Sequence, residues 1–365
     1  MKRLLFSAYD MNVGGIETSL LTLLNTLVDK EYEITLVLEK KQGVFLNELD
    51  SRIQVLQYTP CEYKLIPLRK AINLGKRIWF SLRYKNKFDF AASYATYSRM
   101  GSFVARTASM HNALWVHSDY MEVYKKDIAK IQHFFDTLKC EEFTHIILVS
   151  KASYQSFYRV YPELEDKLIC MGNLMNYHKI ERLANKEVAL ENKHVYTFLT
   201  VGRHSEEEKR LTRAIEASEK LKNDGFSFQV WFVGGGKDTQ MYKKMVEQKG
   251  LQEYIKFFGI QKNPYPYFKK ADAILVTSDY EGYPVIFQEA FVLNKPIITT
   301  DVSDAKLDIE GRFGKVVIKE VDEIYEAMKQ FITQGYEIKE KFAPEEYNRE
   351  MIERLENVIE HKNEV

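Results

Sequence analysis

Four charged side chains in the second half of the chain have types and a spacing suited to chemistry. Arg203 and Lys209 follow a short apolar stretch, and fixed cations are suited to phosphate oxygens. Glu281 and Glu289 follow a second apolar stretch, and carboxylates accept hydrogen bonds from sugar hydroxyls. This spacing indicates a site for a phosphate and for paired hydroxyls. The alternative is that Arg203 and Lys209 are solvated loop charges that pair with Glu206–Glu208.

The stretch between the two glutamates predicts a turn that opens a helix. Its members are Gly282, Tyr283, Pro284, Val285 and Ile286. A helix N-terminus presents unpaired N–H groups and the positive end of the helix dipole, and both favour an anion. We therefore expect the backbone of this stretch to complete a phosphate site.

The first half of the chain offers fewer candidates. Gly14 and Gly15 stand between an apolar stretch and the start of a helix, where glycine lets a ligand approach the backbone. The alternative is an ordinary turn. His117 ends another apolar stretch, a place where a lone histidine is more often structural, and Asp119 is a weaker candidate beside it.

Short apolar stretches alternate with helical patterns along the chain, which is typical of parallel sheets with crossover helices. The pattern begins twice in 365 residues and predicts an α/β protein of two Rossmann-like, doubly wound domains. We expect these domains at 1–175 and 176–343, followed by a helical segment, 344–365, that could pack back on the first domain. The expected strands are 4–9, 34–38, 53–57, 88–93, 113–116, 145–149, 168–171, 196–201, 227–233, 255–258, 273–277 and 296–300.

Composition excludes several classes of protein. Lys and Arg together number 52, as do Asp and Glu, and this balance argues against a nucleic-acid binder. The three cysteines have neither disulfide-framework nor zinc-site spacing, which favours a reducing cytoplasm. Neither a signal peptide nor a membrane span is predicted, so we expect any membrane role to be peripheral, on the inner face of the cell membrane.

The region 64–87 carries eight basic residues and no acidic one, and predicts a helix that docks on an anionic membrane. We expect an apolar stripe of this helix to pack on the sheet and Phe80 to be exposed among the cations. The alternative is a solvated basic face that serves an acidic soluble glycan. The expected stripe is Leu68, Ala71, Ile72, Gly75, Ile78, Trp79 and Leu82.

Arg203 with Lys209, and Glu281 with Glu289, resemble the donor site of glycosyltransferase family 4, most specifically over 196–301. The resemblance implies a GT-B fold, retention of anomeric configuration and a role in bacterial surface or capsular polysaccharide synthesis. The chain departs from the family pattern at Arg210, where the family usually has glycine.

Carried over to this sequence, the resemblance assigns a role to each position. Arg203 and Lys209 would hold the diphosphate, Glu281 the donor sugar and Glu289 the ribose hydroxyls. His117 would face the sugar from the other domain. The implied partners are a UDP- or GDP-linked hexose donor and a glycan or lipid-linked acceptor.

The sequence contains no Asp-x-Asp motif, the usual metal–diphosphate clamp of the other large glycosyltransferase fold, so we expect neither a metal nor another cofactor. Three alternatives remain open at this stage: a GT-B sugar-nucleotide epimerase, a non-catalytic binding or scaffold protein, and a NAD-binding protein. The last lacks the dinucleotide fingerprint.

Overall fold

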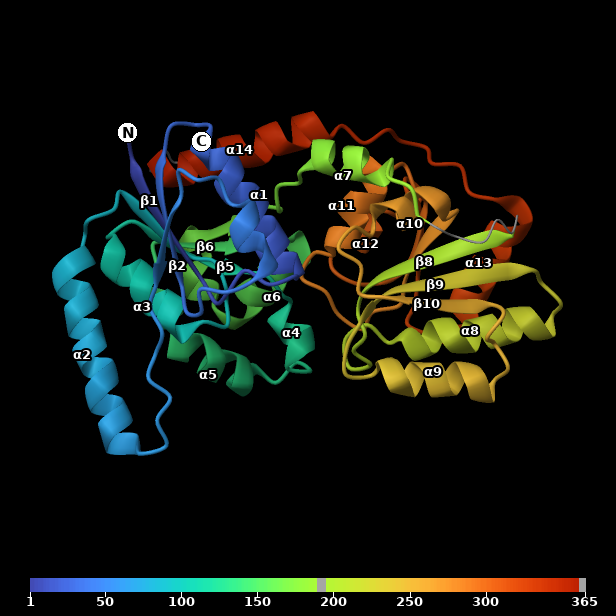
Figure 1. Ribbon diagram of the computed structural model, residues 1–365, viewed down its shortest axis with the longest axis horizontal. Helices are drawn as coiled ribbons and strands as arrows, with labels where there is room; N and C mark the ends of the chain where they lie inside the picture. The colour runs from blue at the N-terminus through green and yellow to red at the C-terminus, as the bar shows by residue number, and fades with distance from the viewer. Residues whose placement is uncertain (189–194, 361–365) are drawn as a thin grey trace. The chain divides into compact units, whose positions relative to one another are not determined.

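Two parallel β-sheets organise the chain, one in each of two units that are defined by their internal contacts (Figure 1). Unit 1 comprises Met1–Met175 together with the chain from Glu345 onward, and unit 2 comprises Asn176–Pro344. The computed structural model describes residues 1–188 and 195–360. The predicted α/β class of two doubly wound parallel sheets is confirmed.

The seven strands of unit 1 run in the order β3-β2-β1-β4-β5-β6-β7. Consecutive residues of the central strands are buried, because a parallel sheet is covered on both faces. The chain leaves in opposite directions along the sheet from β1 and β4, and these neighbours form the switch point. The strands are β1 (Arg3–Ala8), β2 (Glu33–Leu38), β3 (Gln54–Gln57), β4 (Phe90–Ser93), β5 (Asn112–Val116), β6 (His145–Leu148) and β7 (Leu168–Cys170). The helices are α1 (Gly15–Val28), α2 (Ile66–Tyr84), α3 (Arg99–Ala108), α4 (Tyr120–Val123), α5 (Ile128–Leu138) and α6 (Lys151–Val160).

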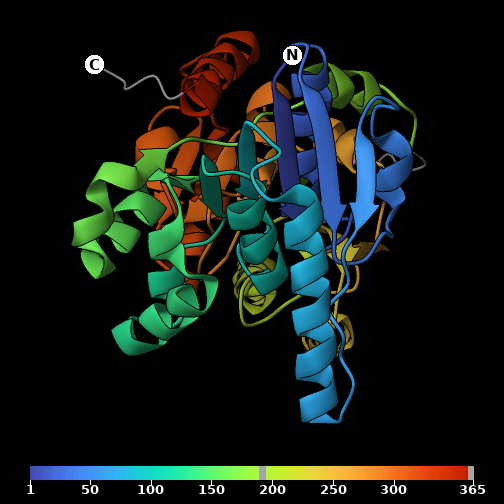
Figure 2. The ribbon, with the colours of Figure 1, turned by 90° about the vertical axis from the view of Figure 1, so that its left-hand side faces the viewer.

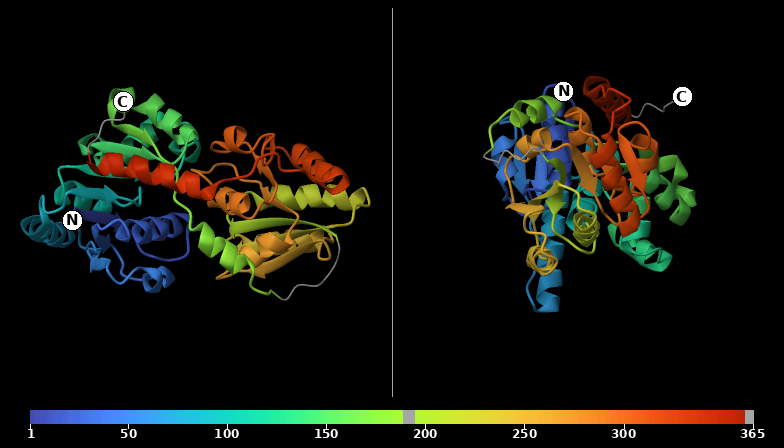
Figure 3. Two further views of the ribbon diagram at one scale, coloured as in Figure 1. Left: turned by 90° about the horizontal axis from the view of Figure 1, so that it is seen from above. Right: turned by 90° about the vertical axis from the view of Figure 1, so that its right-hand side faces the viewer.

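The last helix, α14 (Pro344–Glu360), packs on unit 1 although it follows unit 2 in the chain (Figure 3). The Asn348 side chain donates to the Met175 carbonyl at 2.7 Å and accepts from its N–H at 3.1 Å. The ring of His111 bonds to the Val358 carbonyl at 2.5 Å. These polar contacts, together with four buried apolar residues of α14, attach the helix to unit 1.

Unit 2 contains a six-stranded parallel sheet in the order β10-β9-β8-β11-β12-β13. Its switch point lies between β8 and β11, so the loops that follow these two strands emerge side by side. The strands are β8 (Tyr196–Arg203), β9 (Phe228–Gly235), β10 (Ile255–Gly259), β11 (Ala273–Val276), β12 (Ile297–Thr300) and β13 (Gly314–Val317). The helices are α7 (Tyr177–Ala184), α8 (Leu211–Asn223), α9 (Thr239–Gln248), α10 (Tyr265–Lys270), α11 (Val285–Val292), α12 (Ala305–Asp308) and α13 (Val321–Gln334).

Across the two units, the strands β1 to β12 lie close to the twelve ranges expected from the sequence. The strand β13 was not expected. It is four residues long and begins with Gly314, which reads as a loop. The glycine is required by packing, since a Cβ there would lie 1.9 Å from the Ile297 carbonyl oxygen of β12. The close approach of the two backbones therefore requires a glycine in this edge strand, and the glycine gave the sequence the appearance of a turn.

The expected orientation of α2 is wrong. Phe80 is 1% exposed and packs edge-on against Tyr58, with ring centroids 5.4 Å apart. The apolar stripe that was expected on the sheet is largely exposed, with Trp79 at 55% and Leu82 at 83%. Figure 2 shows the N-terminal part of this light-blue helix extending beyond the sheet of unit 1. Among the described residues, no helix is long and apolar enough to cross a bilayer.

Candidate donor-binding site

The switch point of unit 2 brings two of the sequence candidates into direct contact. Lys209 comes from the loop after β8 and Glu281 from the loop after β11, and Lys209 Nζ lies 2.5 Å from Glu281 Oε1. Glu208 Oε1 lies 3.1 Å from the same ammonium group. Burial lowers the pKa of Lys209, but the charges of Glu281 and Glu208 outweigh burial and raise it. Lys209 is therefore a fixed cation at neutral pH.

Arg203 lies next to this pair at the end of β8. Its side chain is 70% exposed, and Nη2 lies 2.8 Å from Glu208 Oε2. Burial raises the pKa of Glu208, but Lys209 and Arg203 outweigh burial and lower it. These contacts use only part of the donors that a lysine and an arginine carry, so both cations can still donate to a bound anion.

The predicted alternative for Arg203 and Lys209, pairing with the neighbouring glutamates, is thus partly realised. Glu208 pairs with both cations, whereas Glu206 accepts hydrogen bonds from Thr212 at 2.6 Å and from Tyr242 at 3.1 Å. Glu206 is structural. Glu208 is a member of the cluster that the sequence analysis named only as a pairing partner of the cations and not as a site residue.

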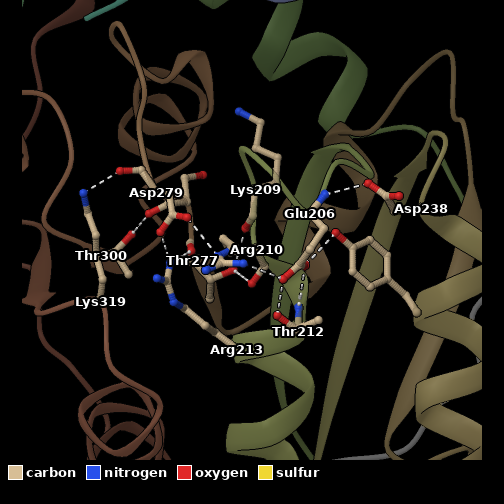
Figure 4. Close-up of polar contacts among 12 residues, drawn as sticks. Glu206, Lys209, Arg210, Thr212, Arg213, Asp238, Thr277, Asp279, Thr300 and Lys319 are labelled. Carbon is tan, nitrogen blue, oxygen red and sulfur yellow. Dashed lines mark hydrogen bonds and ion pairs between the residues drawn. The ribbon is translucent and has the colours of Figure 1, made fainter. Parts of the chain in front are cut away.

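A polar network fixes the backbone on which Lys209 stands (Figure 4). The Thr277 hydroxyl lies 2.9 Å from the Lys209 carbonyl oxygen and 3.1 Å from that of Arg210. The N–H of Asp279 donates to the Glu208 carbonyl at 2.8 Å. Because both partners follow β11, the network ties the loop after β8 to the loop that carries Glu281.

Arg210 is the position at which glycine is usual in the family that the sequence resembles. It has φ 49° and ψ 48°, the left-handed conformation that glycine adopts at least cost. Its Nε lies 2.8 Å from Asp279 Oδ2 as an ion pair, without the alignment of a hydrogen bond. Arg213 Nη1 lies 2.6 Å from the other carboxylate oxygen of Asp279. The side chain of Arg210 thus offsets part of the backbone cost that an arginine incurs there.

The turn between the glutamates is held from the segment after β12, which comprises a short loop and helix α12. Ser303 donates to the Gly282 carbonyl, and Tyr283 donates to Asp308 at 2.8 Å. Pro284 then precedes the first turn of α11. The N–H groups of Val285 and Ile286 belong to this first turn, where a helix leaves its N–H groups without helical partners. An anion-binding backbone is consistent with this arrangement.

Glu289 lies in α11, and its carboxylate accepts a hydrogen bond from Tyr265 at 3.2 Å. Desolvation raises the pKa of Glu289 to about 7, and the Tyr265 hydroxyl lowers it by a smaller amount. In the described residues, Glu289 and Glu281 are not in contact with each other. Each carboxylate can therefore bind a separate group of a ligand.

The candidates of unit 1 lie at the carboxyl ends of β1 and β5. Gly14 caps α1 with extended backbone, and an added Cβ would lie 2.2 Å from Glu17 Oε2. Gly15 begins the helix. Burial lowers the pKa of His117 to about 3, so its ring is neutral, and its Nε2 is buried without a hydrogen-bond partner among the described residues. Its ring lies 4.7 Å from that of Tyr94, measured between centroids.

Asp119 has a structural role. Its carboxylate caps α4 by accepting from the Met121 N–H at 2.9 Å, and it accepts from the Ser156 hydroxyl at 2.8 Å. Residues 1–188 and 195–360 contain no group of three or more His, Cys, Asp or Glu side chains that could hold a metal ion.

The sequence of unit 2 carries a family signature. Residues 181–351 match the model of glycosyl transferases group 1. The group 1 match includes all four charged candidates, from Arg203 to Glu289, and the loops that position them.

Curated relatives are also glycosyltransferases. An uncharacterized glycosyltransferase of Methanocaldococcus jannaschii is 24% identical over 213 residues, which are 54% of this chain and 49% of that protein. A lipopolysaccharide 1,6-galactosyltransferase of Escherichia coli K12 is 26% identical over 118 residues, 31% of this chain and 32% of that protein. This chain therefore spans about half, or less, of the length of these relatives.

The structure of Anabaena HepE in complex with UDP and glucose has the same fold. Its TM-score is 0.76 at 16% identity, and the match covers 98% of this chain and 100% of that chain. The GT-B fold implied by the sequence resemblance is confirmed.

A matched pair of variants tests the role of Arg210. We expect Arg210→Ala to lose the contact with Asp279 while keeping a side chain at positive φ. Arg210→Gly loses the same contact but removes the backbone cost, so we expect it to be more stable than Arg210→Ala by roughly 1 kcal/mol. Urea unfolding measures both free energies. Equal stability of the two variants would show that the left-handed conformation carries no cost here.

The shifted pKa of Glu289 predicts a pH-dependent stability. The pKa of Glu289 is higher in the folded state than its ordinary value of 4.5, so the ionised carboxylate destabilises the fold. This loss of stability is absent below pH 4.5 and complete above about pH 7. We expect Glu289→Gln to raise the melting temperature well above pH 7 and to change it little near pH 4.5. The exposed Glu247→Gln on α9 is the control. A stabilisation that is independent of pH would contradict the assigned cause.

Proposed function

We propose that the chain is a retaining glycosyltransferase that moves a hexose from a nucleoside diphosphate donor to a glycan or lipid-linked acceptor of a cell-surface polysaccharide. The observation that carries this proposal is the contact between Lys209 and Glu281, with Arg203 beside it, at the switch point of the unit 2 sheet. The relatives named for lipopolysaccharide synthesis support the polysaccharide context.

In this proposal, the cations bind the diphosphate and favour its departure. Cleavage of the glycosyl–phosphate bond places negative charge on the leaving oxygen, and fixed cations nearby lower the barrier. Arg203 and Lys209 are held in place before the ligand arrives, by Glu208 and Glu281, so little reorganisation is needed. The N–H groups at the start of α11 complete the anion site.

Each glutamate then binds a different set of hydroxyls. Glu281 accepts from Lys209 and, at 2.7 Å, from Ser278, which orients its carboxylate toward a donor sugar. Glu289 binds the ribose hydroxyls, and its ionisation is favoured once these hydroxyls donate to it. His117, neutral and with no hydrogen-bond partner for its Nε2 among the described residues, contacts a sugar hydroxyl. Gly14 and Gly15 let substrate approach the backbone at the start of α1, beside the Glu17 carboxylate.

Retention follows from a same-face displacement in this proposal. Glu281 is engaged by Lys209 and Ser278, which makes it a binding group and a poor nucleophile. The leaving diphosphate then takes the proton of the acceptor hydroxyl as that hydroxyl attacks from the same side.

We propose a UDP-linked donor in preference to a GDP-linked donor, because the structure of HepE contains UDP. We place the reaction in the cytoplasm.

Ligand binding by variants tests the diphosphate site. Lys209→Met and Arg203→Gln should each weaken UDP binding about tenfold or more, since a charge-assisted hydrogen bond is lost, and change uridine binding by less than about twofold. Isothermal titration calorimetry measures both ligands, and Lys244→Met on α9 is the matched control. If uridine binding fell as far as UDP binding, the two cations would not be the diphosphate ligands.

Activity in a chelator tests metal independence. We expect transfer from UDP-hexose to continue in excess EDTA, because protein cations take the place of a metal at the diphosphate. Product formation is followed by the release of UDP and by the appearance of the glycosylated acceptor. Loss of transfer in EDTA that manganese or magnesium restores would refute the metal-free mechanism.

A further inference from the structure

Helix α2 of unit 1 presents two faces of opposite character, and within residues 1–188 and 195–360 only one of them is covered by other parts of the chain. The occupied face carries Phe80, whose ring lies 6.0 Å from that of Phe103. Lys76 Nζ donates to the Thr59 carbonyl at 2.7 Å, and Asn73 bonds to the backbone of Cys61. Polar and aromatic groups therefore hold α2 on the rest of unit 1.

The opposite face is apolar and open. Five large apolar side chains on it are between 45% and 83% exposed, and a Cβ added to Gly75 would meet no atom within 4 Å. At 3.6 residues per turn these positions form one continuous surface along the helix. Continuous exposed apolar surface marks an interaction site, whereas scattered apolar residues do not. The five residues are Leu68, Leu74, Ile78, Trp79 and Leu82.

The charges around this apolar face indicate the kind of surface that binds it. Residues 64–87 carry eight basic side chains and no acidic one. Helical spacing places Lys70 and Arg83 at the two edges of the apolar face. A partner protein would have to match this face with an apolar surface bordered by acidic residues. An anionic bilayer provides acyl chains and negatively charged headgroups along the whole length of the helix. An acidic soluble glycan would leave the apolar side chains in water.

We propose that α2 lies on an anionic lipid bilayer, with its apolar face among the headgroups and its flanking cations on the lipid phosphates. The exposed tryptophan and long basic side chains suit the boundary between headgroups and acyl chains. This proposal does not depend on the donor site, because its test contains no sugar and no nucleotide. Failure of transfer and failure of lipid binding are thus separate results.

Vesicle binding by the full-length chain tests the proposal. Vesicles of phosphatidylglycerol with phosphatidylcholine should bind the chain, vesicles of phosphatidylcholine alone should not, and added salt should weaken binding. Trp115 and Trp231 are 2% and 6% exposed, so a blue shift of tryptophan fluorescence on binding reports Trp79. Binding to both kinds of vesicle alike, or to neither at low salt, would overturn the proposal.

Paired variants separate charge, apolar contact and folding. Lys64→Glu with Lys70→Glu should weaken binding at least about tenfold, and Lys244→Glu with Lys270→Glu on unit 2 should not, although the net charge changes equally. Leu74→Ser with Leu82→Ser should also weaken binding, unlike Met110→Ser with Ile318→Ser, which alters exposed apolar residues elsewhere. Melting temperatures confirm folding.

Two further results would overturn the proposal. The first is equal loss of binding in the control variants, which would show a non-specific effect of charge or of surface apolarity. The second is a concentration-dependent dimer, observed by sedimentation velocity, that Leu74→Ser with Leu82→Ser abolishes. In that case a second copy of the chain covers the apolar face.

Discussion

The attachment of the loop after β8 to the loop after β11 is the constraint on which the candidate site depends. A parallel sheet places the ends of these two strands next to each other, but it does not fix the loops that follow. Thr277 and Asp279 supply that attachment through the carbonyls of Glu208, Lys209 and Arg210. Lys209 can then meet Glu281, whose charge favours the ionised form of Lys209.

Lys209 and His117, one from each unit, show two ways in which a buried polar group is accommodated. Lys209 of unit 2 keeps its charge because Glu281 lies within hydrogen-bond distance of it. In unit 1, His117 has no such partner in the part of the chain that the structure describes, and desolvation keeps its ring neutral. The first arrangement is suited to a charged group and the second to a hydroxyl.

The donor-site loops and α2 show why local patterns can mislead. An arginine at a glycine position suggested a departure from the family, yet Arg210 retains the glycine-like backbone and adds an ion pair with Asp279. The apolar stripe of α2 has helical periodicity. Periodicity shows that one face is more apolar than the other, but it does not determine which face packs on the rest of the unit. Phe80 decided the orientation, because its ring completes an aromatic cluster with Tyr58 and Phe103.

The sequence by itself determined the two parallel sheets, since buried strands appear as short apolar runs whatever their neighbours are. It also placed Arg203, Lys209 and Glu281 just after strands, and the carboxyl ends of parallel strands share one edge. Tertiary structure alone decided that Lys209 pairs with Glu281 and that Asp279 supports Arg210, and it selected unit 1 for α14, which the sequence had offered as one option. It also decided which face of α2 is open. The physical reason is that these outcomes depend on contacts between residues distant in the chain, whereas the periodicity of strands and helices is local.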